Sequence, residues 1–211
     1  MTPSVRLIET VRVRRAEAPL WEQHLARLHR SAAALGLALE PIAAPTGADR
    51  IVRISAGPDG ALTEDRPVPL PVPVPVAFAS VPHPGYPHKT DQRAAFDAAR
   101  KEARLDGADE ALLLAAEGWV AEGTFTTLLW WEGEALAGPP LALGILPSVA
   151  RERITRLRGE IIERRVVPGD LRGRAIFLAN AARGIMEVVS LQGESVPHDP
   201  RTATLRDGFW P

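Results

Sequence analysis

Alternation of apolar and polar residues predicts two short strands in the first quarter of the chain. Residues 6–13, with the sequence RLIETVRV, alternate with the period of two that is typical of a strand, and so do residues 51–55, IVRIS. Between them, residues 19–39 carry apolar side chains near helical spacing and a glycine close to the end, which predicts a helix. The sequence GPDG at 57–60 then predicts a turn.

A proline-rich segment follows this turn, at residues 66–76 with the sequence RPVPLPVPVPV. Because alternate prolines cannot donate hydrogen bonds to neighbours on both sides, we expect an edge strand or a polyproline II connector here. We interpret the segment as the seam between two lobes. The expected lobes are a small α/β lobe over residues 1–80 and a larger lobe over residues 81–211.

The second lobe is expected to combine helices with strands in hairpins. Residues 90–105 have the charged amphipathic pattern of a helix, with Thr90 or Asp91 as the candidate N-cap. The other expected elements are a strand at 109–115, a turn at 117–120, a hairpin at 126–136, a helix from near Ser148, and strands at 174–179 and 185–191. Hairpins in place of a regular βαβ series predict a mixed α/β (α+β) fold.

Composition indicates a globular protein of 211 residues, with 45% hydrophobic and 24% charged residues. The formal net charge of −1 gives no broad basic surface for nucleic acid. Cysteine is absent, which excludes disulfides, thiolate metal sites and a cysteine nucleophile. The start of the chain lacks a signal-peptide core, and no run approaches the ~20 apolar residues of a membrane span. We therefore expect a cytoplasmic protein without nucleic-acid or membrane partners.

Local motifs leave the chemistry open. The five histidines form no HxxxH or HExxH pair, so we expect no metal site, and neither GxSxG nor GxxxxGK[ST] occurs. The segment 144–151, GILPSVAR, has a glycine, a proline and a serine ahead of a predicted helix, where backbone N–H groups suit a phosphate as well as an ordinary N-capped helix. By themselves, Asn180 suits a turn residue and Glu122 suits a solvated strand end.

Lysine is rare in this chain, with Lys89 and Lys101 standing among 25 basic residues. The preference for arginine, together with abundant alanine, is typical of a GC-rich genome and is not itself functional information. Lys101 falls on the charged face of a predicted helix. Lys89 lies beside a histidine just after the proline-rich segment, where no such explanation applies.

Six segments, in order along the chain, resemble the class IV aminotransferase family. The six are ETVRV (9–13), HLARLHRSAAALG (24–36), HKTDQRAAFDAAR (88–100), ADEALLLAAEGWVAEGTFTTLLW (108–130), GPPLALGILPSVAR (138–151) and FLANAARGIMEV (177–188). The resemblance extends from about residue 7 to residue 191. It implies a two-lobed fold like that of D-amino-acid aminotransferase, known as fold type IV, with pyridoxal 5′-phosphate (PLP) between the lobes. It also implies a homodimer with its active sites near the interface.

The resemblance assigns roles to individual residues. Lys89 corresponds to the lysine that binds PLP covalently, and such an amine needs a pKa lowered by burial near other cations. Glu122 corresponds to the carboxylate that faces the pyridine nitrogen, and Arg27 to the arginine whose bidentate fork holds the phosphate. The other implied cofactor contacts are Leu146 against the ring and the backbone of Val149, Ala150, Asn180 and Ala181 around the phosphate.

Within the family, the segments ETVRV, HKT..R and N.ARG are most similar to aminodeoxychorismate lyase, including the lyase-like domain fused to some aminobenzoate synthases. The implied reaction belongs to folate biosynthesis and releases 4-aminobenzoate and pyruvate. In it, Lys89 would remove a proton and Thr10 would lie near the reacting carbon. Either Arg12 or Arg183 would hold a carboxylate of the amino-acid-like substrate.

Departures from the family pattern keep two alternatives open. Only eight residues precede Glu9, so we expect the small lobe to be shortened at its N-terminus. Ala94 stands where branched-chain enzymes have a tyrosine, which argues against that subfamily. Alanines replace common hydroxyl residues near positions 150 and 181, so phosphate binding would rely on backbone N–H groups and Arg27. The alternatives are a class IV transaminase of D- or branched-chain amino acids and a catalytically silent PLP-binding homologue.

Overall fold

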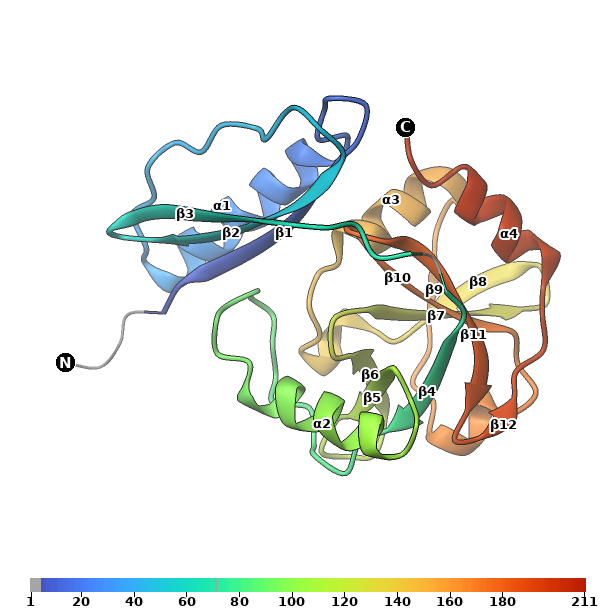
Figure 1. Ribbon diagram of the computed structural model, residues 1–211. Coiled ribbons are helices and arrows are strands. Elements are labelled where there is room, and N and C mark those ends of the chain that lie inside the picture. Colours follow the sequence, from blue (N-terminus) through green and yellow to red (C-terminus); the bar gives the residue numbers. More distant parts are fainter. Residues whose placement is uncertain (1–4, 71) are drawn as a thin grey trace.

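The computed structural model describes residues 5–70 and 72–211 and contains two β-sheets flanked by helices (Figure 1). The smaller sheet is antiparallel, with the order β1-β2-β3. Its elements are β1 (Leu7–Val13), β2 (Arg50–Gly57) and β3 (Gly60–Arg66), and helix α1 (Trp21–Leu35) covers one face. The two predicted strands and the predicted helix of this region are confirmed, and the GPDG turn joins β2 to β3.

The alternation in β1 gives the small sheet one buried face and one face that is free to line a site. Leu7, Val11 and Val13 are buried against α1, where Trp21 and Leu28 complete the core. Ile8, Thr10 and Arg12 alternate with these residues and point to the opposite face, which is turned away from α1. Helix α1 ends at Gly36, whose φ of 64° is the left-handed conformation favoured by glycine.

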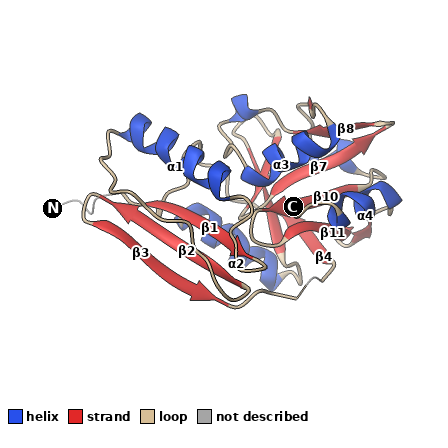
Figure 2. Cartoon of the chain, turned by 90° about the horizontal axis from the view of Figure 1, so that it is seen from above, coloured by secondary structure: helices blue, strands red, loops and turns tan. Residues whose placement is uncertain are grey.

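The larger sheet has nine strands and lies beside the smaller sheet and α1 (Figures 1 and 2). Its order is β6-β5-β4-β11-β10-β7-β8-β9, with β12 paired to β11. The strands are β4 (Val74–Phe78), β5 (Glu110–Leu114), β6 (Val120–Gly123), β7 (Thr127–Glu132), β8 (Ala135–Gly138), β9 (Ile162–Glu163), β10 (Ile176–Asn180), β11 (Gly184–Leu191) and β12 (Glu194–Ser195). Three pairs are parallel, β4–β5, β4–β11 and β8–β9, so the expected mixed α/β fold is confirmed.

Apolar side chains on both faces of the large sheet hold its helices. In β7, Leu129 and Trp131 pack toward α3 and α4, whereas Leu128 and Trp130 join a second cluster on the other face. A third cluster fixes α2 through Phe96. The helices are α2 (Ala94–Leu105), α3 (Val149–Arg158) and α4 (Pro200–Asp207), with short 3₁₀ turns η1 (Leu141–Leu143) and η2 (Pro168–Leu171). None of the helices in the described ranges has the length and apolar character needed to cross a membrane.

The proline-rich segment differs from its expectation at its C-terminal end. Strand β4 begins at Val74, and it lies inside the large sheet between β5 and β11 instead of at an edge. Pro75 is tolerated there because the register of β11 shifts between Val188 and Ser190, so the missing N–H meets an irregularity in the ladder. The change from one sheet to the other therefore falls between β3 and β4, before residue 80. The division into lobes at 80/81 stays a prediction.

The second predicted helix begins later than expected. Helix α2 starts at Ala94 after Arg93, and neither Thr90 nor Asp91 caps it. Thr90 instead forms a β-bridge with Leu7 at the start of β1, and these backbone groups are therefore unavailable to a helix. The C-terminal segment, for which the sequence predicted no element, contains α4 and, close to the end of the chain, the fully buried Phe209.

Candidate active site

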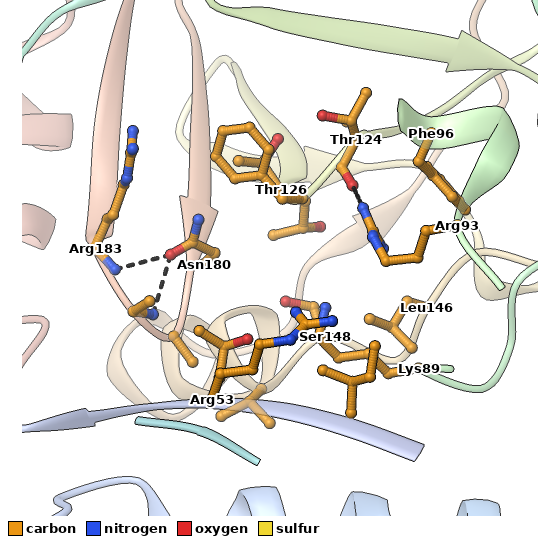
Figure 3. A pocket seen from close by; sticks show the side chains of 18 of the residues that line it. Arg53, Lys89, Arg93, Phe96, Thr124, Thr126, Leu146, Ser148, Asn180 and Arg183 are labelled. Carbon is orange, nitrogen blue, oxygen red and sulfur yellow. Dashed lines mark hydrogen bonds between the residues drawn. The ribbon is translucent and has the colours of Figure 1, made fainter. Parts of the chain in front are cut away.

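A cavity of about 490 Å³ lies between the two sheets, in the size range of small-molecule sites. Strands β1 and β2 form one wall, and the segment before α2 forms another. The loop between β6 and β7, the start of α3 and the turn between β10 and β11 complete it (Figure 3). Segments far apart in sequence thus meet at one place.

Hydrogen bonds fix the segment that carries Lys89 against strand β1. The N–H of Ile8 donates to the carbonyl of Lys89 at 2.7 Å. One residue on, the N–H of Thr90 donates to the Tyr86 hydroxyl at 2.7 Å. The backbone of Lys89 is therefore held in place while its side chain lines the cavity.

The amine of Lys89 is suited to act as a nucleophile. Its pKa is lowered from 10.5 to about 7. Burial is the largest cause, the positive charges of Arg27 and Arg93 add to it, and the carboxylates of Glu9 and Glu122 oppose it. A substantial fraction of the amine is therefore unprotonated at neutral pH. Lys101, by contrast, is exposed on α2.

Glu122 is the second-last residue of β6, and its side chain is buried in the cavity wall. Its Oε1 accepts hydrogen bonds from the Leu146 N–H at 3.0 Å and from Nε2 of His83 at 2.9 Å. The Gly85 N–H donates to Nδ1 of His83 at 3.2 Å, so the ring proton is on Nε2 and points at the carboxylate. With Oε1 satisfied twice, Oε2 is left for a ligand.

A buried charged cluster lies beneath the cavity, between β1 and α1. Arg27 donates to both carboxylate oxygens of Glu9, from Nε at 2.9 Å and from Nη2 at 2.5 Å, and Nδ1 of His24 lies 2.6 Å from Oε2. Burial would raise the pKa of Glu9, but Arg27 and His24 together outweigh it and lower the pKa to about 2. Burial also lowers the pKa of His24, and its Nε2 has no partner among the described residues.

This cluster limits which N–H groups of Arg27 could bind a phosphate. The bidentate edge of its guanidinium is used by Glu9, so it cannot also grip a phosphate with that edge. Nη1 remains at the cavity side, 3.3 Å from the carbonyl of Pro147. Arg27 can therefore offer a phosphate Nη1, the second hydrogen of Nη2 and its charge.

Two chain turns present backbone N–H groups at the cavity. Ser148 caps α3 by accepting the Arg151 N–H at 3.3 Å, which leaves the N–H groups of Val149 and Ala150 in the first turn without a partner in the helix. Such groups suit a phosphate. After β10, Oδ1 of Asn180 shapes the turn in which Ala181 lines the cavity. Together with the free Oε2 of Glu122, these groups fit PLP.

The loop between β6 and β7 is held from below by Glu110. This buried carboxylate accepts the Thr124 N–H at 2.9 Å and the Thr126 hydroxyl at 2.8 Å. Burial raises its pKa, and the two threonines oppose that effect. A side chain at Gly123 would collide with Thr126, so the loop needs glycine there. The arrangement places Phe125 in the cavity wall.

The structure brings most of the predicted site residues together. Apart from those already placed, Thr10, Leu146 and Arg183 also line the cavity. Ala150 is fully buried and is not among the lining residues, so any contact with a ligand would be through its backbone N–H. Arg12 is not among the lining residues, and its guanidinium lies 3.3 Å from Asp49. Of the two arginines predicted to meet a substrate, only Arg183 is in position.

Sequence reasoning missed Arg53, Arg93, Arg100 and His83. Strand alternation could have found Arg53, because the buried residues on either side of it face the opposite way. Helical spacing could have found Arg100, which lies on α2 about two turns after Arg93, the residue that precedes this helix. His83 carried no local signal, since its partner Glu122 is 39 residues away.

The Amino-transferase class IV family model matches residues 43–191. A solved structure of a candidate 4-amino-4-deoxychorismate lyase is 30% identical with a TM-score of 0.77, covering 100% of this chain and 91% of that one. A candidate amino-acid aminotransferase from Mesorhizobium loti is 28% identical with a TM-score of 0.78, covering 89% of this chain and 100% of that one. No curated protein matches the chain by sequence.

A third structure, a branched-chain aminotransferase from Thermoproteus uzoniensis with norvaline, has a TM-score of 0.86 at 23% identity, covering 97% of this chain and 84% of that one. This likeness confirms fold type IV. The family model covers well over half of the chain, from the segment just before β2 to the end of β11. The chain therefore belongs to the class IV aminotransferase family, whose members are enzymes that use PLP.

Proposed function

We propose that the protein is an aminodeoxychorismate lyase, which converts 4-amino-4-deoxychorismate into 4-aminobenzoate and pyruvate. The observation that carries the proposal is that Thr10 and Lys89 line one cavity, on segments joined by the hydrogen bond from Ile8 to Lys89. A hydroxyl on β1 is what the lyase resemblance requires. The likeness to a candidate lyase that spans the whole chain supports the same function.

Lys89, Glu122 and His83 would have different roles in the proposed reaction. PLP, when bound, withdraws electrons from the substrate carbon that bears the amine. Lys89 would hold the cofactor covalently and, once the substrate amine has displaced it, would remove the proton from that carbon. Glu122 would keep a proton on the ring nitrogen, oriented by His83 and the Leu146 N–H.

Thr10 would deliver a proton to the departing side chain. When the proton leaves C4 of the substrate ring, the C3–O bond breaks and the ring becomes aromatic. The released enolate takes up one proton and becomes pyruvate, so the reaction consumes no water and needs no second substrate. Leu146, nine-tenths buried in the wall, would pack against the cofactor ring.

The test supplies aminodeoxychorismate to the PLP-loaded protein with no keto acid present. We expect pyruvate and 4-aminobenzoate in equal amounts over many turnovers. Thr10→Val should lower kcat by about a hundredfold, the scale of general acid catalysis, whereas Thr10→Ser should keep most of it. No pyruvate from a protein that has bound PLP would reject the lyase proposal.

A transaminase is the second candidate, favoured by the likeness to the Mesorhizobium loti protein at 28% identity. A transaminase transfers the amine to the cofactor and then stalls until a keto acid accepts it, which is ping-pong behaviour. A single turnover with aminodeoxychorismate or a D-amino acid, followed by recovery on adding 2-oxoglutarate, would establish this function in place of the lyase.

We also propose that the protein forms a homodimer with the cavity near its interface. Leu70 is 81% exposed and Val72 is 52% exposed in the segment between the sheets, close in sequence to Pro67 and Pro69 of the cavity wall. A second copy of the chain would cover these apolar side chains. Light scattering should give twice the monomer mass, and Leu70→Asp should reduce it. A cytoplasmic location stays a prediction.

A further inference from the structure

Four arginines of the cavity take no part in the proposed proton transfers, and of these only Arg183 was expected to contact a substrate. Arg53 comes from β2, Arg93 precedes α2, Arg100 lies on α2, and Arg183 lies in the turn after β10. Among the described residues, none of the four has a carboxylate within ion-pair distance, unlike Arg66, which pairs with Glu64. The cavity, whose lining also includes Asp91, Asp97 and Glu122, therefore holds four guanidinium groups that form no direct ion pair with the described residues.

Aromatic rings hold three of these guanidinium groups. The central carbon of Arg93 lies 4.9 Å from the ring centre of Phe96. Arg100 and Arg183 lie 4.6 and 5.4 Å from the ring centre of Phe125, so one ring carries two cations. Stacking engages the flat face of a guanidinium and leaves its N–H groups free in the plane. The rings thus orient the arginines without using their N–H groups, of which Nη2 of Arg93 donates to the carbonyl of Thr124 (Figure 3).

The four arginines form two pairs. Arg53 and Arg93 influence each other electrostatically, and Figure 3 shows both in the part of the cavity that holds Lys89. Arg100 and Arg183 share Phe125. Burial lowers the pKa of Arg100, and the positive charge of Arg183 contributes to this effect. The Nε of Arg100 is buried without a partner among the described residues.

We propose that Arg100 and Arg183, stacked on Phe125, bind a second carboxylate of the substrate, so that the cavity selects amines with two carboxylates. Arg53 and Arg93 would hold the first carboxylate nearer Lys89. The guanidinium fork matches a carboxylate, and an anion between two unpaired cations removes their repulsion. This inference deepens the proposed function and rests on it, because aminodeoxychorismate carries two carboxylates.

The test measures binding of two keto acids that differ in one carboxylate. The PLP-loaded protein is titrated calorimetrically with 2-oxoglutarate and with 2-oxopentanoate, which have the same carbon chain and no amine to displace Lys89. We expect 2-oxoglutarate to bind at least about tenfold more tightly, as for hydrogen bonds to charged groups. Arg100→Gln and Arg183→Gln should each remove most of this preference and leave 2-oxopentanoate affinity within about twofold.

Arg104→Gln is the matched control, because Arg104 lies one turn after Arg100 on α2, is exposed and does not line the cavity. Arg104→Gln should bind 2-oxoglutarate more tightly than 2-oxopentanoate, as the wild type does. Equal affinity of the wild type for both acids, or an equal loss in Arg104→Gln, would overturn the inference. Because Arg100→Gln and Arg183→Gln test the same site independently, the inference can still be tested if one of them fails to fold.

The outcome separates this inference from the lyase proposal. If the protein prefers the dicarboxylate through Arg100 and Arg183 but releases no pyruvate from aminodeoxychorismate, the carboxylate site is supported and the lyase proposal is rejected. If the wild type, Arg100→Gln and Arg183→Gln all release pyruvate with the same KM, the lyase function is supported and the carboxylate site is rejected.

Discussion

His83 donates its Nε2 proton to Oε1 of Glu122 across 2.9 Å, and both side chains are buried. The hydrogen bond from Gly85 to the other ring nitrogen excludes the opposite tautomer. The carboxylate of Glu122, which we propose to face the cofactor, is thus oriented by a histidine that does not itself line the cavity. Removing His83 should therefore affect the chemistry more than the fold.

We expect His83→Leu to retain PLP but to lower kcat by about tenfold or more, since a hydrogen bond to a charged group is worth ~1.5–3 kcal/mol. NMR of bound PLP labelled with ¹⁵N at the ring nitrogen reports its protonation directly. The pyridinium signal should weaken in His83→Leu and return in His83→Gln, whose amide can donate to Glu122. An unchanged signal in His83→Leu would mean that the Leu146 N–H suffices to hold the carboxylate.

Local sequence patterns were sufficient to predict much of the fold. Strand β1 was predictable because its alternation reflects one buried face, and α3 was predictable because Ser148 caps it through a bond only three residues long. Strand β4 was not predictable, since Pro75 is tolerated only because of an irregularity in β11, more than a hundred residues later. The start of α2 likewise depends on pairing between Thr90 and Leu7.

The candidate site shows the same division. Lys89, Glu122 and Arg27 followed from the family resemblance, and the structure places all three at one cavity. The commitment of Arg27 to Glu9 could not be read from the sequence, because it depends on α1 packing against β1. The stacking of two arginines on Phe125 requires three separate segments to meet.

The ion pair between Glu9 and Arg27 should behave as a buried unit. Arg27→Gln leaves the Glu9 charge without its main partner, so we expect a loss of about 3–5 kcal/mol in the free energy of unfolding. The double variant Glu9→Gln/Arg27→Gln should lose clearly less than the sum of the single variants, by at least about 1 kcal/mol. Urea unfolding of the cofactor-free proteins measures all three, and simple additivity would contradict the pairing.

The same pair predicts a dependence of stability on acid. Because the pKa of Glu9 is lowered from its ordinary 4.5 to about 2, its contribution to stability is fully present above pH 4.5. It should be lost progressively as the pH falls from about 4.5 to about 2. Glu9→Gln should lack this part of the acid response, and a wild type and variant with parallel pH profiles would contradict the lowered pKa.

The loop that carries Phe125 should depend on glycine at position 123. A methyl group there would collide with Thr126 and press on Glu110, so Gly123→Ala should cost about 1–3 kcal/mol of stability. Gly169→Ala is the control, because nothing lies within 4 Å of a Cβ at that position. Thermal unfolding compares the two, and equal stability would show that the loop adapts freely.

The lowered pKa of Lys89 predicts how quickly the protein takes up PLP. Only the unprotonated amine attacks the cofactor, so the attachment rate should rise as the pH passes through about 7 and level off above it. An ordinary lysine, with a pKa of 10.5, would give a rate that still rises at alkaline pH. Stopped-flow absorbance across this range distinguishes the two profiles.

Peptide mapping after borohydride reduction of the PLP-loaded protein tests the central claim most directly, because reduction makes the bond between cofactor and lysine permanent. The chain offers only Lys89 and Lys101 as attachment points, and Lys101 is exposed on α2. We predict that the pyridoxyl label is found on Lys89 alone and disappears in Lys89→Gln, while Lys101→Gln labels as the wild type does. A label on Lys101, or on neither lysine, would contradict the assignment of this cavity as the PLP site.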